Sequence, residues 1–311
     1  MTKLPYLLSF LLSASLFFTA CEKSNPPETR NLLEIAGARA ELSTFLTAIE
    51  LAGLTAMLDG NGSFTVFAPT NTAFAAYLAA NGYAQLEDVP LASLKQLLQY
   101  HMVIGALKTG DVTTGYIASL ATFGASTSVL KLYLENTGAL LINNNAAVTT
   151  ADLMGTNGVI HVVNKVITLP KVVEHLQNDI TLSAFIVALT RPDLSIDYFA
   201  TLTEPGPFTV FAPDNAAFAA LLIELGLDNL NDIPEAQLNS ILQYHIVANT
   251  NLPAEQLEDT LEVTTLGGKK ITINAGNKLT DQQGRQGNLI TLDIQAANGV
   301  VHSLDRVLRP N

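Results

Sequence analysis

The stretch "TVFAPTNTAF" at residues 65–74 returns almost unchanged as "TVFAPDNAAF" at residues 209–218. In both copies β-branched and aromatic residues lead into Ala-Pro, and a polar pair then opens an apolar helical pattern. This order predicts a strand, a proline stop, a helix cap and an amphipathic helix. Because the motif recurs at the distance of a whole domain, it indicates duplication of a complete folding unit.

The helix that follows each strand has two candidate caps. Thr70 or Asn71 can accept the free backbone amides in the first copy, and Asp214 or Asn215 can do so in the second. The sequence leaves the choice within each pair open.

Further segments recur in the same order. They are "LSTFLTAI" (42–49) with "LSAFIVAL" (182–189), "LEDVPLASLKQLLQYHMV" (86–103) with "LNDIPEAQLNSILQYHIV" (230–247), and "NGVIHVVNKVI" (157–167) with "NGVVHSLDRVL" (298–308). Each unit therefore has helices first, a strand and helix in the middle, and a mostly antiparallel sheet at the end. That mixed order predicts the α+β class. Two such units of about 140 residues have the usual size of a domain.

The composition narrows the classes of partner. Hydrophobic residues make up 48% of the chain and charged residues 14%, which is typical of a compact globular protein. The 16 Lys and Arg residues are outnumbered by 28 Asp and Glu residues, so the net charge is −12. A surface of this charge repels phosphate backbones and anionic lipid head groups, and we expect no nucleic-acid partner.

The N-terminus reads "MTKLPYLLSFLLSASLFFTAC", with Lys3 before a short apolar run that ends at small residues. The pattern predicts a secretory signal peptide over residues 1–20. Cys21, the single cysteine of the chain, resembles the lipidated residue of a bacterial lipobox, so we expect a membrane lipid anchor there. Glu22 follows it, which favours the outer membrane over retention at the inner one. The polar, Pro-containing residues 21–30 are typical of a tether. Two like domains then occupy residues 31–170 and 171–311, joined by a short, stiff connection at Pro170.

These repeated blocks resemble the fasciclin domain family. "TVFAPTNTAF" looks like its first conserved block, "LLQYHMV" like its Tyr-His segment, and "NGVIHVVNKVI" like its second conserved block. The resemblance covers both domains in full. It implies two tandem domains, each a small β-wedge packed against several helices. It also implies a non-enzymatic adhesion or interaction protein whose partner is a protein or glycan of the cell surface or matrix.

The resemblance also suggests residues that contact a partner. In animal members of the family, adhesion has been linked to the Tyr-His segment and to an Asp-Ile pair before the second block. The matching positions are Tyr100, His101, Asp152, Leu153, Tyr244, His245, Asp293 and Ile294. The first copy has Leu153 where Ile is usual, and neither copy has the Asn-Lys that precedes the pair in some members. The two tyrosines can instead belong to the core, with the ring buried and the hydroxyl hydrogen-bonded.

Four histidines occupy equivalent places in the two copies. They are His101, His161, His245 and His302. A metal or catalytic site would require His101 to meet His161 with help from Asp152. No short ligand spacing is present, so we expect the histidines to lock the helix-to-strand junctions and expect no metal or cofactor. His175 has no counterpart, and we expect it to face solvent from a helix.

Nucleophile elbows, phosphate-binding loops and dinucleotide-binding turns are absent from the sequence, and we expect no enzymatic activity. The alternative is a protein of the cell envelope that binds a small ligand or glycan. A deep apolar cavity with converging polar groups would favour that alternative. A flat surface rimmed by loops would favour adhesion.

Overall fold

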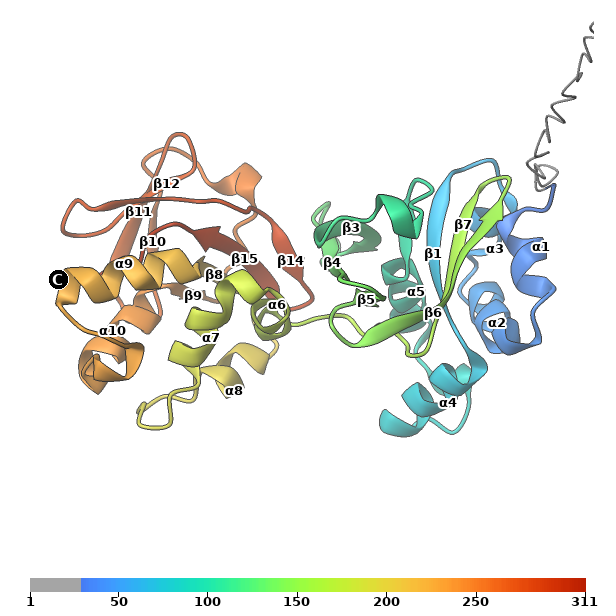
Figure 1. The fold of residues 1–311 in the computed structure, drawn as a ribbon, viewed down its shortest axis with the longest axis horizontal. Coiled ribbons are helices and arrows are strands. Elements are labelled where there is room, and N and C mark those ends of the chain that lie inside the picture. Colours follow the sequence, from blue (N-terminus) through green and yellow to red (C-terminus); the bar gives the residue numbers. More distant parts are fainter. Residues whose placement is uncertain (1–28) are drawn as a thin grey trace, which may run out of the picture.

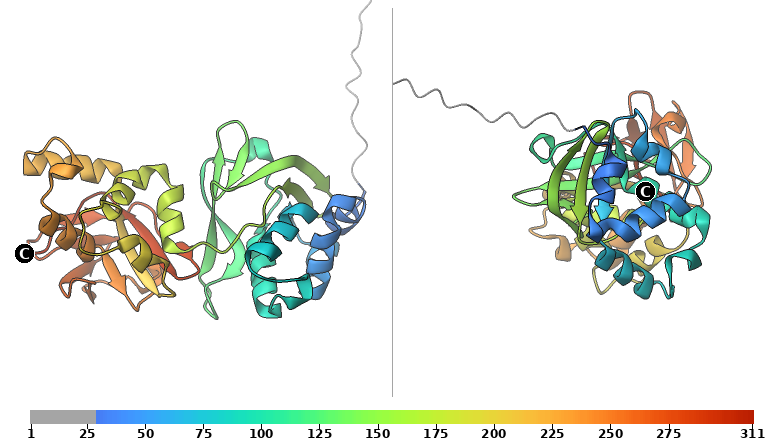
Figure 2. Two further views of the ribbon diagram at one scale, coloured as in Figure 1. Left: turned by 90° about the horizontal axis from the view of Figure 1, so that it is seen from below. Right: turned by 90° about the vertical axis from the view of Figure 1, so that its right-hand side faces the viewer.

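The computed structural model describes residues 29–311, which form two domains arranged end to end (Figures 1 and 2). The predicted signal peptide over 1–20, Cys21 and most of the tether over 21–30 lie outside the described residues. Across residues 29–311, none of the helices combines the length and apolar character needed to cross a bilayer.

The N-terminal domain has one seven-stranded sheet, and the helices of residues 32–59 gather at the end away from the second domain (Figure 1). The sheet order is β2-β1-β7-β6-β5-β4-β3. The strands are β1 (Phe64–Pro69), β2 (Met102–Ile104), β3 (Gly115–Thr122), β4 (Val129–Asn136), β5 (Leu140–Ile142), β6 (Ala146–Gly155) and β7 (Gly158–Val163). The helices are α1 (Leu32–Gly37), η1 (Ala40–Leu42), α2 (Ser43–Leu51), α3 (Thr55–Asp59), α4 (Asn71–Ala80), η2 (Leu86–Asp88), α5 (Leu91–Tyr100) and η3 (Thr109–Asp111).

The C-terminal domain repeats this order but divides its strands into two four-stranded sheets, β10-β11-β12-β13 and β14-β15-β8-β9. The strands are β8 (Phe208–Pro213), β9 (Ile246–Ala248), β10 (Glu262–Thr264), β11 (Lys270–Asn274), β12 (Lys278–Thr280), β13 (Gln286–Asn288), β14 (Ile294–Ala296) and β15 (Gly299–Leu304). The helices are α6 (Val172–Asn178), η4 (Ile180–Leu182), α7 (Ser183–Leu189), α8 (Tyr198–Thr203), α9 (Asn215–Leu225), η5 (Leu230–Asp232), α10 (Glu235–Tyr244) and η6 (Ala254–Gln256). The predicted α+β class is confirmed.

The first and last strands of each domain pair in parallel. β1 runs beside β7 from Phe64 opposite Gly158 to Pro69 opposite Val163, and β8 runs beside β15 in the same way. The other strand pairs are antiparallel, as the sequence predicted for most of the sheet. A parallel pair needs a long crossover between its strands, and here the crossover is most of the domain.

An Asn-Gly turn starts the last strand of each domain and ties the helices to it. The Asn157 side chain accepts from the backbone N of Leu32 at 2.8 Å and donates to the carbonyl oxygens of Leu58 and Gly60 at 2.8 Å. Asn298 makes the equivalent bonds in the second domain. Gly158 and Gly299 have φ values of 143° and 153°. The asparagine side chains thus anchor the N-terminal helices of each domain to the start of its last strand.

The structure resolves which residue caps the helix after the first strand. Thr70 Oγ1 accepts from the backbone N of Ala73, and Asp214 Oδ1 accepts from Ala217. The neighbouring asparagines have a different task. Asn71 accepts from the backbone N of Thr44 and donates to the carbonyl of Ala40, so it joins α4 to the start of α2. Asn215 joins α9 to α7 with the same geometry.

The junction between the domains contains a buried histidine. β4 of the first domain lies against β14 of the second. The Tyr116 ring of β3 packs edge-on against His175 of α6 with 5.4 Å between ring centroids, and its hydroxyl donates to the His175 carbonyl at 3.1 Å. The expectation that His175 faces solvent is therefore wrong, because docking of the first domain encloses the ring completely. Pro170 already accepts a hydrogen bond from Ala297 at 2.7 Å, which shortens the free connection.

We predict that Gly299→Ala destabilises the second domain by roughly 3 kcal/mol or more. A Cβ at this position would lie 2.2 Å from the Phe208 carbonyl oxygen, and the left-handed φ disfavours any L side chain. Urea denaturation of the full chain measures the change. Gly110→Ala is the control, because its Cβ meets no atom within 4 Å and it should leave the transition unchanged. Equal stability of both variants would contradict this account of the turn.

Candidate functional site

The Tyr-His segments end α5 and α10 and lie in the interior of their domains. Tyr100, His101 and His245 are fully buried, and Tyr244 is 1% exposed. The question left open for the tyrosines is thus settled in favour of the core. The histidines, which were also candidates for partner contact, have no surface through which a partner could touch them. The physical reason is that both side chains of each segment satisfy backbone groups of other elements.

His101 connects a helix to the end of the domain. Its Nδ1 donates to the Leu97 carbonyl at 2.7 Å, and its Nε2 accepts from the backbone N of Ile167 at 2.9 Å. His245 repeats this with the Ile241 carbonyl at 2.9 Å and the backbone N of Leu308 at 3.1 Å. These partners assign one neutral tautomer, since one nitrogen must donate and the other must accept. Burial lowers the pKa of both imidazoles to about 4.

The tyrosine hydroxyls bind the helix ends to the sheet. Tyr100 donates to the Lys131 carbonyl at 2.7 Å and accepts from Asn143 at 2.9 Å. Tyr244 donates to the Lys270 carbonyl at 2.6 Å and accepts from the backbone N of Gln282 at 3.3 Å. Burial raises the pKa of both phenols, and that of Tyr244 to about 12. Both rings are therefore neutral structural groups at any ordinary pH.

The other pair of repeated histidines holds the aspartate loops in place. His161 Nδ1 accepts from the backbone N of Asp152 at 3.2 Å, and its Nε2 donates to the Leu107 carbonyl at 2.8 Å. His302 makes the matching bonds with Asp293 and Leu252 at 3.3 and 2.8 Å. The structure thus brings Asp152 to His161, as a metal site would require. The contact is nevertheless made through the backbone of Asp152. The two histidines have the structural hydrogen-bonding role that was expected, but they exert it from the last strands and not at a helix-to-strand junction.

The aspartates occupy strained, partly exposed positions. Asp152 and Asp293 have φ values of 56° and 57°, in the left-handed region that L side chains rarely adopt. The Asp152 carboxylate accepts from the backbone N of Thr109 at 2.9 Å, and that of Asp293 from Ala254 at 2.7 Å. Burial of Asp152 acts to raise its pKa, but the hydrogen bonds from Thr109 outweigh this and lower it. Each carboxylate therefore fixes a loop while keeping part of its surface open.

The residues after the aspartates differ in exposure. Leu153 is half-buried opposite Ile160 on β7, whereas Ile294 is fully buried opposite Val301 on β15. Of the eight residues suggested by the family resemblance, three present surface to a partner. They are Asp152, Leu153 and Asp293. Ile294 joins the tyrosines and histidines as a core residue, because it packs in the hydrophobic core of its own domain beside the last strand.

Residues 29–311 contain no group of three or more His, Cys, Asp or Glu side chains placed to hold a metal ion. The pockets described there are open to solvent, and polar and apolar groups are mixed in their linings. One of about 200 Å³ lies between the domains and is lined by Lys131 from β4 and by Glu255, Asp293 and Gln295. Another of about 240 Å³ lies beside Arg285 and Arg309. Sequence reasoning did not anticipate this arginine pocket, because it belongs to one copy only and has no repeated motif.

The buried histidines predict a fold that weakens in acid. The unfolded chain protonates imidazoles near pH 6.5, whereas the folded chain protonates His101, His175 and His245 only near pH 4. Between these values the unfolded state binds more protons, so the free energy of unfolding falls as the pH drops from about 6.5 to about 4. Thermal unfolding of the full chain across this range measures the loss.

The substitution His101→Gln should lower the free energy of unfolding by about 2–4 kcal/mol at neutral pH, because two buried backbone groups lose their hydrogen-bond partner. The free energy of unfolding of this variant should also fall less steeply between pH 6.5 and 4 than that of the unaltered chain. Lys95→Gln, on the exposed face of the same helix, is the matched control for both measurements. An acid profile unchanged by His101→Gln would show that this imidazole does not titrate on unfolding.

Comparisons with known proteins place this geometry in a family. The model of the Fasciclin domain matches residues 40–170 and 181–310. The chain is 29% identical over 282 residues to transforming growth factor-beta-induced protein ig-h3 of Sus scrofa, an alignment that covers 90% of this chain and 40% of the relative. It is 36% identical over 143 residues to Protein sll1483 of Synechocystis sp., covering 45% of this chain and 73% of that protein.

Among solved structures, a FAS1 domain pair from the insect cell adhesion molecule Fasciclin I has the same fold. The TM-score is 0.54 at 17% identity, and the match covers 86% of this chain and 96% of the insect pair. The chain spans about two fifths of the length of ig-h3. Because both halves of the chain match the family model in sequence and the pair matches in fold, this protein belongs to the fasciclin domain family and carries two fasciclin domains in tandem.

Proposed function

We propose that this chain is a lipid-anchored, extracytoplasmic adhesion or interaction protein without enzymatic activity. Its partners are proteins or glycans of the cell surface or matrix. The observation that carries the proposal is a pair of complete fasciclin domains that follows an N-terminal segment ending in a lone cysteine. Fasciclin I, whose domain pair shares the fold, is a cell adhesion molecule.

The shared motif residues support a division of labour between core and surface. Several polar residues recur in both copies, namely the tyrosines, the histidines and the asparagines. Their side chains form hydrogen bonds with backbone groups of their own domain. A partner must therefore be recognised by residues outside these motifs, together with the partly exposed Asp152, Leu153 and Asp293. Such a surface can change its partner while the scaffold stays intact.

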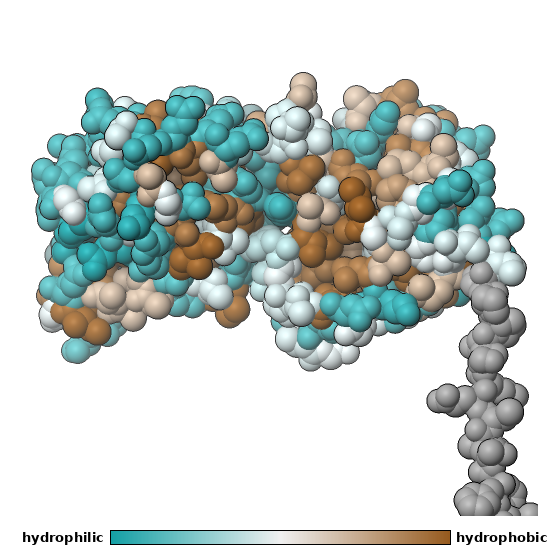
Figure 3. All heavy atoms as spheres, turned by 90° about the horizontal axis from the view of Figure 1, so that it is seen from above, coloured by the Kyte–Doolittle hydropathy of each residue, from teal (hydrophilic) through white to brown (hydrophobic). Residues whose placement is uncertain are grey.

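The surface offers apolar as well as polar contacts. Within residues 29–311, six large aliphatic side chains are more than half exposed. They are Leu91, Ile104, Ile180, Val187, Ile223 and Ile290. Figure 3 shows a continuous apolar area on one face of the N-terminal domain, whereas the C-terminal domain is mostly hydrophilic in that view. Larger apolar areas of this kind are common where proteins meet partners.

The net charge of −12 supports anchoring by a lipid rather than by direct adsorption to the membrane. Anionic head groups repel such a surface, so a covalent chain on Cys21 supplies the attachment. The tether over 21–30 then gives the paired domains reach. We place the protein at the outer membrane because Glu22, rather than Asp, follows the cysteine.

A second function, binding of a small ligand or glycan in the envelope, draws its support from the arginine-lined pocket beside Arg285 and Arg309, although this pocket is open to solvent and is not the deep apolar cavity typical of ligand-binding proteins. That pocket is confined to the C-terminal domain. It is compatible with adhesion through a glycan, and its chemistry is developed below.

Deletion of the gene should reduce attachment and biofilm formation, and the full chain should restore both. The variant Cys21→Ala keeps both domains but loses the acceptor of the lipid. It should therefore move to the soluble fraction, lose labelling by a fatty-acid analogue and fail to restore attachment. Attachment that is unchanged by deletion under several growth conditions would remove the support for adhesion. Restoration by the alanine variant would instead show that the anchor is dispensable.

A further inference from the structure

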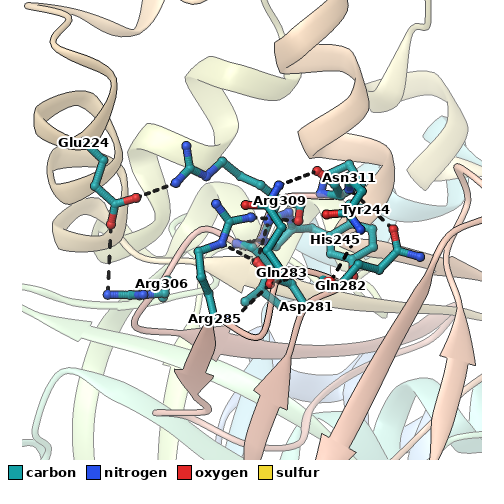
Figure 4. Close-up of polar contacts among 12 residues, drawn as sticks. Glu224, Tyr244, His245, Asp281, Gln282, Gln283, Arg285, Arg306, Arg309 and Asn311 are labelled. Atoms are coloured by element: carbon teal, nitrogen blue, oxygen red, sulfur yellow. Dashed lines mark hydrogen bonds and ion pairs between the residues drawn. The ribbon is translucent and has the colours of Figure 1, made fainter.

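Three arginines gather at one end of the C-terminal domain (Figure 4). Arg285 lies in the turn between β12 and β13, and Arg306 and Arg309 follow the last strand. Their carboxylate partners are Asp281 and Glu224, the latter on α9. Three positive groups thus face two negative ones, in a chain that has 28 acidic and only 16 basic residues. This excess of positive charge is local and is held by structure.

Asp281 is the anchor of the cluster. Its side chain is fully buried and accepts from the backbone N of Gln283 and Arg285 at 2.9 and 3.0 Å. It also accepts from Arg285 Nε at 2.7 Å and from the backbone N of Arg309 at 3.2 Å. Arg285 Nη2 donates to the Arg309 carbonyl at 2.8 Å. The two arginines therefore stand side by side without needing a ligand to position them.

Arg309 has donor capacity that the protein does not use. Its Nη2 donates to Glu224 Oε2 at 2.7 Å, while its Nε is buried and has no hydrogen-bond partner in the described chain. A buried donor without an acceptor costs free energy, which an incoming oxygen would recover. Guanidinium groups form strong, charge-assisted hydrogen bonds with carboxylates, so a carboxylate is the ligand group that fits Arg309.

The pocket next to these arginines has a volume of about 240 Å³. Gln237 and Ser240 line it from α10, and Gln283 and Asn311 line it from the other side. Uncharged amides and a hydroxyl donate to and accept from alcohol groups, which is the chemistry of a sugar ring. Pro310 adds apolar surface for the carbon face of such a ring. The size suits one ring rather than an extended ligand.

The first domain lacks this arrangement at the equivalent place. The backbone N of Ile167 donates to His101 as that of Leu308 donates to His245, so the next residues, Thr168 and Arg309, correspond. The first copy therefore has a neutral residue where the second has a guanidinium. The arginine is therefore not part of the scaffold that the two copies share.

We propose that the pocket beside Arg285 and Arg309 binds the carboxylate-bearing ring of an acidic sugar, a uronate. The carboxylate binds at the guanidinium of Arg309, where Nε has no partner of its own, and the ring hydroxyls meet the side chains of α10. This inference rests on the proposed function, because it names the class of ligand that a binding protein of this kind would take. It concerns one pocket and not the adhesive surface as a whole.

Calorimetric titration of the purified full chain with glucuronate and galacturonate tests the proposal. Saturable binding of a uronate that weakens as salt is raised is expected, with little binding of glucose, galactose or acetate. Arg309→Gln should weaken uronate binding about tenfold or more, because a charge-assisted pair of hydrogen bonds is lost. Glu224→Gln should strengthen it, because the carboxylate that competes for Arg309 is removed. Arg39→Gln, in an exposed ion pair of the first domain, is the matched control.

Several results would overturn the inference. They are no uronate binding by the full chain, equal binding of acetate or neutral sugars, and unchanged affinity in Arg309→Gln when its thermal unfolding matches that of the unaltered chain. Arg309→Gln is chosen over a change at Arg285, which would leave the buried Asp281 without its partner and could unfold the domain. If uronate binding fails while gene deletion still reduces attachment, this inference falls and the proposed adhesion stands. If the chain binds uronate but gene deletion leaves attachment intact, the proposed adhesion falls and the uronate site stands.

Discussion

Each domain depends on the parallel contact between its first and last strands, and that contact depends on a glycine. At Gly158 and Gly299 the chain passes so close to the opposite strand that any Cβ would overlap a carbonyl oxygen. The asparagine before each glycine then anchors the N-terminal helices to the same turn. The Asn-Gly turn therefore determines three features together: how the domain closes, where its helices lie, and the register of its last strand. The histidines of the last strand follow from this register, because it brings them under the aspartate loops.

The repeated polar residues form a system of neutral side chains buried among backbone groups. Each repeated histidine uses one nitrogen as donor and the other as acceptor, which satisfies groups that no regular strand or helix reaches. Buried polar groups are costly unless they are paired, so these residues are constrained by their surroundings more strongly than surface residues are. Motifs that define a family can thus be motifs of folding, and recognition is left to the surface around them.

The two copies differ where the scaffold leaves them free. His175, which has no counterpart in the first copy, is enclosed by Tyr116 and turns a helix face into the junction between domains. Arg309 stands where the first copy has Thr168, and it lines a pocket together with Arg285. The two copies thus share a scaffold and differ in the side chains that they place around it. The asymmetry between the copies is for this reason more informative about binding than their similarity.

The sequence by itself determined the duplication, the α+β class, the strand-cap-helix order and the family, because these depend on local residue patterns and on their repetition. It also indicated that the histidines are structural, since no ligand spacing is present. Only the tertiary structure decided that the first and last strands are parallel and that Tyr100, Tyr244 and Ile294 are core residues. It alone showed that His175 is buried and that two arginines share a pocket. Each of these features depends on contacts between residues far apart in the chain. Hydrophobic periodicity and secondary-structure propensity are local properties and carry no information about such contacts.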